Sequence, residues 1–212
     1  IALSHLSQIG DAQSSNANYL KAIRILEDVI AESSDETLSN SHIYQSHLGY
    51  IHFEYGRTAE KRGAKNASIY FAKARDIWDD DVHLDPLTSQ RLAWLLATCN
   101  SHDVRDPKKA VALAKKCLAN APGNAAFIAT LVVSLLANND IDQAVEFLRV
   151  FPPFQPKEPV RLTFARAVVF RAIDDAANAE IYSRAAIERM DQQAPFNRDL
   201  VYLKSLCADS RQ

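Results

Sequence analysis

Three histidines recur at five-residue intervals, and imidazole nitrogens at that density could in principle hold a metal ion. They are His42, His47 and His52. On an α-helix a step of five residues turns the side chain by about 140°, so successive rings point in different directions. Three such rings on one continuous helix cannot meet on one zinc ion. We therefore interpret them as surface or interface histidines.

Other potential metal ligands are equally unpromising. The aspartates at 79–81 and Asp85 could attract a cation, but their spacing lacks the glycine and the final glutamate of a calcium loop. Cys99, Cys117 and Cys207 are odd in number, widely spaced and set in apolar surroundings. We expect reduced, packed thiols, and the sequence predicts neither a metal site nor a cofactor.

The chain offers little support for catalysis or for binding nucleotides, nucleic acids or membranes. It has five glycines among 212 residues, with neither a GxGxxG nor a GxxxxGK run. We find no nucleophile paired with a base, and expect no enzymatic activity. A net charge of -2 argues against a nucleic-acid partner. The longest nearly apolar run, Ala125 to Ala137, has 13 residues, fewer than the roughly 20 needed to cross a bilayer.

Four lysines could receive a charged partner. Lys108 and Lys109 lie seven residues before Lys115 and Lys116, so on a helix the two pairs share a face. Such a face could bind an acidic or phosphorylated partner. It could equally be the solvated outer side of a helix.

The elements that would carry these residues follow from a recurring three-point pattern. Residues spaced four and then three apart mark one helix face in five places, and the third and fourth sets are 34 residues apart. The sets are Ala22/Leu26/Val29, Ala67/Phe71/Ala74, Ala110/Ala114/Cys117, Ala144/Leu148/Phe151 and Ala179/Ser183/Ala186. Self-similarity at this period predicts an all-α chain of stacked helical hairpins. Gly10 and Gly49, inside predicted helices, indicate close approach of a partner helix.

Capping signals and polar stretches divide the pattern into helices. Asp106-Pro107 is the strongest start signal, because aspartate accepts an orphan N–H bond and proline has no N–H to leave unpaired. The predicted helices run from around Leu6 to Gly10, then over 19–31, 41–61, 66–79, 90–100, from 106 onwards, 125–137, 141–150, 161–173, 176–190 and 196–208. The predicted connections include turns at 14–18, 101–105 and 138–140, a polar segment at 33–40 and a loop around 79–88.

These residues resemble the tetratricopeptide repeat family, of the type found in large bacterial proteins. Residues 90–122 and 124–151 carry the resemblance best: Leu96/Ala97 pairs with Ala110, and Leu131/Val132 with Ala144. In the fifth repeat the small-residue position falls on Arg166 or Ala167, depending on register. The resemblance implies one right-handed superhelical solenoid over residues 1–212, with repeats at about 3–36, 41–82, 87–124, 125–158 and 159–192, and a capping helix at 196–208.

The resemblance also implies a concave groove, lined by the first helix of each hairpin, where peptides or partner helices dock. The residues it places there are Tyr50, Arg91, Trp94, Thr98, Ala129, Val133, Arg161, Phe164 and Val168, with Ser46 as a further candidate. An aromatic and aliphatic floor flanked by arginines has the composition of a binding hot spot. Trp94 and Phe164 could instead pack between hairpins.

Relatives that bind C-terminal carboxylates use a clamp of lysine, arginine and asparagine on three successive first helices. The corresponding positions here carry Ser7 and Asp11, Ser46 and Tyr50, and Trp94 and Thr98. We therefore expect a more apolar peptide or a protein face as ligand, bound by a non-catalytic scaffold.

Two further functions remain open. The chain could be a regulatory or assembly segment of a larger bacterial protein, such as the tail of a signalling kinase or an envelope or secretion assembly factor. It could also mediate homo-oligomerisation, through the helix at Ile1 to Ile9 or through the last helix. A start at Ile1 within helical apolar spacing suggests a fragment of a longer protein, and the lack of a visible targeting segment favours the cytoplasm.

Overall fold

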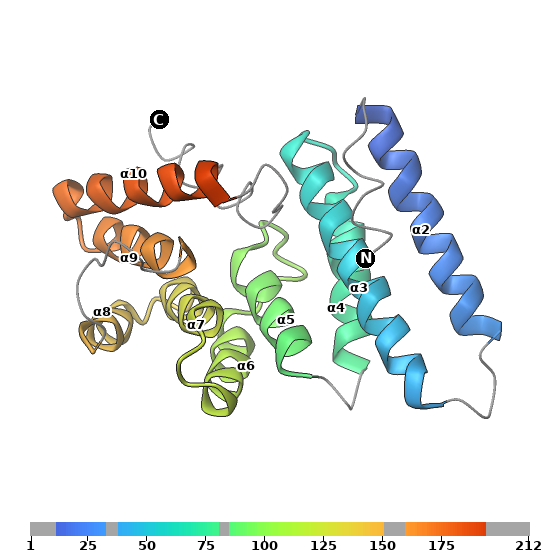
Figure 1. Ribbon diagram of the computed structural model, residues 1–212, viewed down its shortest axis with the longest axis horizontal. Coiled ribbons are helices and arrows are strands. Elements are labelled where there is room, and N and C mark those ends of the chain that lie inside the picture. The colour runs from blue at the N-terminus through green and yellow to red at the C-terminus, as the bar shows by residue number, and fades with distance from the viewer. Residues whose placement is uncertain (1–11, 33–37, 81–84, 151–159, 194–212) are drawn as a thin grey trace. The chain divides into compact units, whose positions relative to one another are not determined.

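The computed structural model describes residues 12–32, 38–80, 85–150 and 160–193, and within them all regular structure is α-helical (Figure 1). The helices are α2 (Ala12–Glu32), α3 (Leu38–Lys61), α4 (Ala67–Asp80), α5 (Pro86–Thr98), α6 (Pro107–Asn120), α7 (Ala125–Ala137), α8 (Ile141–Arg149), α9 (Val160–Ala172) and α10 (Ala176–Gln193). The predicted fold class is confirmed: within each compact unit described below, helices that follow one another in the chain, such as α3 and α4, α6 and α7, or α9 and α10, pack in adjacent pairs, as in a helical repeat protein. The predicted helices near Leu6 and at 196–208 lie outside the described residues.

The helices form two compact units. The first contains α2, α3, α4, the part of α5 up to Leu95, and residues 99–105. The second contains the last turn of α5, at residues 96–98, and α6 to α10. Helix α5 therefore contributes residues to both units.

In the first unit α3 is the central helix, with α2 and α4 packed against it (Figure 1). The close approach predicted at Gly49 is confirmed: a Cβ built there would lie 2.4 Å from Nε1 of Trp78 on α4. Gly56, about two turns further along α3, faces Phe71 of α4 in the same way. The two glycines let the large rings of α4 lie directly on the backbone of α3.

Helix α2 corrects two expectations. Residues 14–18, predicted as a turn, lie inside one continuous helix. Polar side chains suit an exposed helix face as well as a turn, and the side chain of Asn16 accepts a hydrogen bond from Arg62 beyond the end of α3, at 2.7 Å. The buried face of α2 also differs, because Tyr19, Ile23 and Leu26 are buried whereas Ala22 is only half-buried.

In the second unit α7 is the central helix, packed against α6, α8 and α9, while α10 packs on α9. Nine consecutive residues of α7, Phe127 to Leu135, are buried. The alanines of the recurring sequence pattern lie on the buried faces of the helices around α7. Ala110, Ala144 and Ala186 are wholly buried, which confirms them as packing positions.

Helix boundaries follow the capping residues. Asp106 accepts a hydrogen bond from the backbone N–H of Lys109, confirming the predicted start of α6. The prediction for α5 was wrong, because the helix begins at Pro86 rather than near Gln90, capped by Asp85. The long helix ending at Lys61 is confirmed, and Gly63 follows it with a φ of 68°.

The fifth hairpin consists of α9 and α10. The small-residue position predicted at either Arg166 or Ala167 lies on the buried side of α9. Arg166 is itself buried, as are its neighbours Ala165 and Ala167. The Arg166 guanidinium lies 6.0 Å from the centre of the Tyr182 ring on α10, a cation–π distance.

Candidate partner-binding surface

The contact between α3 and α5 in the first unit begins with the cap of α5. Asp85 accepts hydrogen bonds from the backbone N–H of Leu87 at 2.8 Å and of Thr88 at 3.2 Å. It also accepts one from the Thr88 hydroxyl, which in turn lies 2.6 Å from the hydroxyl oxygen of Ser46 on α3. This chain of polar groups fixes the start of α5 against α3.

The same groups set the charge of the cap. Partial burial opposes ionisation of Asp85, but the hydrogen bonds from Thr88 and Leu87, together with the positive charge of Arg91, outweigh it and leave the pKa below its usual value. The carboxylate is therefore ionised at neutral pH. Arg91 thus lies near a fixed negative charge.

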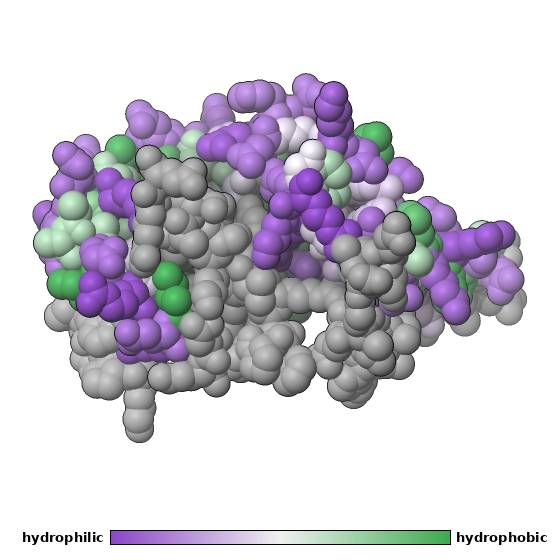
Figure 2. All heavy atoms as spheres, turned by 90° about the horizontal axis from the view of Figure 1, so that it is seen from above, coloured by the Kyte–Doolittle hydropathy of each residue, from purple (hydrophilic) through white to green (hydrophobic). Residues whose placement is uncertain are grey.

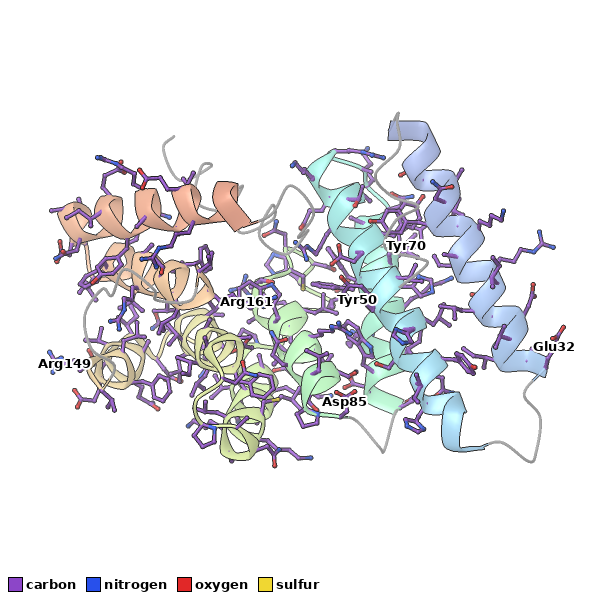
Figure 3. The ribbon with its side chains drawn as sticks, viewed as in Figure 1. Glu32, Tyr50, Tyr70, Asp85, Arg149 and Arg161 are labelled. Atoms are coloured by element: carbon purple, nitrogen blue, oxygen red, sulfur yellow. The ribbon has the colours of Figure 1, made fainter. Side chains whose placement is uncertain are left out.

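One turn along α5, Arg91 meets Tyr50 of α3. The guanidinium carbon lies 4.2 Å from the centre of the Tyr50 ring, within cation–π distance. Both side chains are half-buried, so each keeps part of its surface accessible. Figure 3 labels Tyr50, which lies between α3 and α5, and Asp85 at the N-terminal end of α5. The contact joins two residues that the sequence assigned to the groove.

Trp94, the third predicted groove residue of the first unit, lies one turn beyond Arg91 and is only 6% exposed. Its burial supports the packing alternative. The network also includes Thr88 and Asp85, and the sequence had indicated Asp85 only as a residue that could attract a cation. Asp85-Pro86 repeats the start signal of Asp106-Pro107, so the cap could have been recognised from the sequence.

The other six predicted groove residues belong to the second unit. Thr98, Arg161 and Val168 are half-buried. Ala129 and Val133 on α7 are 1% and 9% exposed, and Phe164 on α9 is 3% exposed. Phe164 therefore also fits the packing alternative.

The buried side of α3 includes a histidine that we expected at the surface. His47 is exposed, but His52 is buried, which corrects its interpretation as a surface or interface residue. The His52 ring stacks with the ring of Tyr70 on α4, and the two ring centroids are 6.0 Å apart. The Nδ1 atom of His52 is buried without a hydrogen-bond partner. Burial and the nearby Lys73 charge lower the pKa of His52 to about 4.

A buried ion pair lies one turn further along α3. Arg57 donates to Glu54 at 2.9 Å, and its guanidinium lies 5.3 Å from the centre of the Phe53 ring. Both charged side chains are nearly inaccessible to solvent. Removing one partner would leave a buried charge uncompensated and would therefore be strongly destabilising.

The cysteines predicted to be packed thiols are buried where the structure describes them. Cys99 and Cys117 are free and buried, whereas Cys207 lies outside the described residues. Burial raises the pKa of Cys99 to about 11, which keeps its thiol protonated and unreactive. Among the described side chains, no group of three or more histidine, cysteine or acidic residues could hold a metal ion.

Several large hydrophobic side chains are exposed in the described part of the chain. They are Leu20, Ile25, Ile43, Ile69, Leu87, Val150, Ile173 and Ile181. On the face shown in Figure 2, hydrophobic residues appear as small separate groups among hydrophilic ones. No described helix combines the length and apolar composition needed to span a bilayer.

Comparisons with known proteins identify the repeat type. Residues 102–164, which include α6, α7 and α8, match the family model described as tetratricopeptide repeat. Comparisons with curated proteins and with solved structures gave no significant match. The matched region contains the alanines Ala110 and Ala144 on which the resemblance rested. Residues 102–164 of this helical chain are therefore similar to the tetratricopeptide repeat family.

Proposed function

We propose that this chain is a non-catalytic scaffold that binds a peptide or a protein, and that Tyr50 and Arg91 contact the partner. Tetratricopeptide repeats are in general protein–protein interaction modules, which supports the class of function. The observation that carries the proposal is the 4.2 Å contact between Tyr50 and Arg91. The two residues come from helices α3 and α5, the first helices of successive predicted hairpins.

The chemistry of this pair suits a binding surface. Tyrosine and arginine are enriched among the residues that dominate binding energies, because each combines a planar face with polar groups. Half-burial leaves part of both side chains accessible while the rest is held by the protein. A side chain that is already ordered loses less entropy on binding, so the contact prepares both residues for a partner.

The polar network at the start of α5 supports the same interpretation. Asp85 and Thr88 anchor α5 to Ser46 on α3, four residues before Tyr50. The anchor holds the start of α5 against α3. In the second unit, taken by itself, the half-buried predicted groove residues are Thr98, Arg161 and Val168, and we propose that these also contact a partner.

Affinity capture from lysate would test this function. The immobilised chain should recover a partner protein that is lost with Arg91→Glu and kept with Arg24→Glu, which reverses an exposed arginine on α2. Circular dichroism must show that both variants are folded. Equal recovery with both variants would contradict a role for Arg91. Recovery of no specific partner would contradict the proposed scaffold function.

A further inference from the structure

Helix α6 carries a concentration of positive charge that the groove hypothesis does not use. It contains four lysines and no acidic residue, in a protein whose net charge is -2. Helices α2, α4 and α10 each contain two basic and three acidic residues, and α8 contains one basic and two. Helix α9 contains three arginines and no acidic residue, but Arg166 is buried and Arg161 half-buried, whereas all four lysines of α6 are exposed.

The four lysines lie together on the accessible side of α6. Lys108, Lys109, Lys115 and Lys116 are all exposed. The opposite side of the helix is formed by Ala110, Val111, Ala114 and Cys117, which are buried. Because residues seven apart lie on the same face, the lysines form two pairs about 10.5 Å apart along the helix axis.

Between the two lysine pairs, only a small side chain projects from the helix. Ala112 lies between them and is exposed, so only a methyl group rises from the helix there. A bound segment can approach the helix over Ala112 with lysines on both sides. In an extended chain, a separation of about 10.5 Å corresponds to about three residues.

We propose that this lysine face of α6 binds an acidic segment of another protein. Charge complementarity argues for the partner: four ammonium groups attract carboxylates and can donate to them. The proposal concerns a different surface from Tyr50 and Arg91. It stands or falls independently of them.

Two other anionic partners fit less well. A helix that lies on a membrane uses an exposed apolar face, but the apolar face of α6 is buried within its own unit. A nucleic acid favours proteins with a wider basic surface, whereas helix α8 of the same unit is net acidic. An acidic protein segment needs only the length of one helix face.

A labelled peptide provides the test. Fluorescence anisotropy of a fluorescein-labelled decaglutamate peptide should show saturable binding to the whole chain at low salt and weaker binding as salt is added. Lys108→Glu/Lys115→Glu should weaken this binding by roughly tenfold or more, because two attractions become repulsions. Lys108→Arg/Lys115→Arg should retain it.

The matched control reverses two exposed lysines elsewhere, Lys61→Glu/Lys65→Glu, and produces the same net charge. It should change the affinity by less than about twofold. Equal losses in the two variants would overturn the proposal, since net charge alone would then explain binding. So would failure of the unmodified chain to bind the peptide.

The partner class is tested in the same assay. Vesicles containing phosphatidylserine and a single-stranded oligouridylate replace the peptide as ligands. The proposal predicts weaker binding of both than of decaglutamate at equal ionic strength. If either ligand binds more tightly and loses affinity with Lys108→Glu/Lys115→Glu, the face recognises that ligand class and the assignment to an acidic protein segment is wrong.

Discussion

At the scale of single residues, His52 links the packing of α3 to pH. Its imidazole is 1% exposed, lies beside Tyr70 and Lys73 of α4, and has a pKa lowered to about 4. In the unfolded chain a histidine titrates near 6.5. Between these values the unfolded state binds a proton that the folded state does not, so the free energy of unfolding falls as pH decreases from about 6.5 towards 4.

Urea denaturation would measure this dependence. We expect the unmodified chain to lose about 2 kcal/mol of stability through His52 between pH 7.5 and pH 5. His52→Phe keeps an aromatic ring beside Tyr70 and removes the titrating group, so its stability should fall less over the same range. Equal pH dependence in the two proteins would show that His52 is accessible to protons in the folded state.

The glycine at position 49 gives a second test at this scale. Gly49→Ala would place a Cβ 2.4 Å from Nε1 of Trp78, a buried side chain that also donates to the carbonyl of Ser46 at 3.2 Å. Moving that ring disturbs the α3–α4 contact, so we expect a loss of about 1–3 kcal/mol.

Gly123→Ala is the matched control, because a Cβ there meets nothing within 4 Å. It should be neutral or slightly stabilising, by up to about 1 kcal/mol, as the unfolded chain loses freedom. Chemical denaturation of both variants measures the difference. A Gly49→Ala protein as stable as Gly123→Ala would mean that α3 and α4 are further apart than described.

The sequence predicted some of these residue contacts and missed others. Gly49 was predictable because a glycine inside a helical pattern needs a packing reason. The burial of His52 was not predictable. The five-residue spacing shows that the three rings point in different directions, but not which of them faces another helix. The Tyr50–Arg91 pair was expected in one groove from family resemblance, whereas its direct contact depends on the spacing of α3 and α5.

At the scale of helices, small residues determine how closely neighbours pack. Ala110 is wholly buried in α6, whereas Ala112 on the same helix is exposed. Ala110→Asp would bury an unpaired carboxylate, so we expect a loss of several kcal/mol, at least about 3. Ala112→Asp should cost less than about 1 kcal/mol, mainly through helix propensity.

Thermal and urea denaturation of the two alanine variants would measure this contrast. A loss below about 0.5 kcal/mol for Ala110→Asp would contradict its place in the packed interface. The two variants share the substitution and the helix, so a difference between them reports burial rather than charge.

Helix boundaries were predictable where a capping residue was recognised. The Asp106-Pro107 start of α6 was correct, as was the whole of α7. The start of α5 was missed because the aspartates before Asp85 resembled a loop, although Asp85-Pro86 carries the same capping chemistry. The first turn of α2 was missed because serine and asparagine favour turns in isolation, and a hydrogen bond from Arg62 to Asn16 is a tertiary contact.

At the scale of the whole molecule, the two units should respond differently to local damage. Both tryptophans of the chain, Trp78 and Trp94, belong to the first unit. Their fluorescence reports on that unit, whereas far-ultraviolet circular dichroism reports on all helices. In a repeat protein, destabilisation acts first on the damaged repeat and its neighbours.

Ala144→Asp, which buries a charge in the second unit, should therefore separate the two signals. We expect the circular-dichroism transition to broaden or begin at lower urea concentration, while the fluorescence transition shifts less. Coincident transitions with equal shifts would contradict separate cooperative units and favour one all-or-none transition.

The repeat architecture at this scale was visible in the sequence because the alanine pattern recurs five times, and the match over residues 102–164 contains the 34-residue interval from Ala110 to Ala144. The division into two units was not visible in the sequence. It depends on where tertiary packing concentrates, and α5, whose residues belong to both units, shows no break in its sequence pattern.

The most direct test of the central claim is amide hydrogen exchange of the chain with and without its captured partner. If Tyr50 and Arg91 contact the partner, binding should slow exchange in the segments that carry them, around residues 46–53 of α3 and 88–95 of α5. Protection confined to other segments, such as the lysine face of α6, would contradict the proposed binding surface.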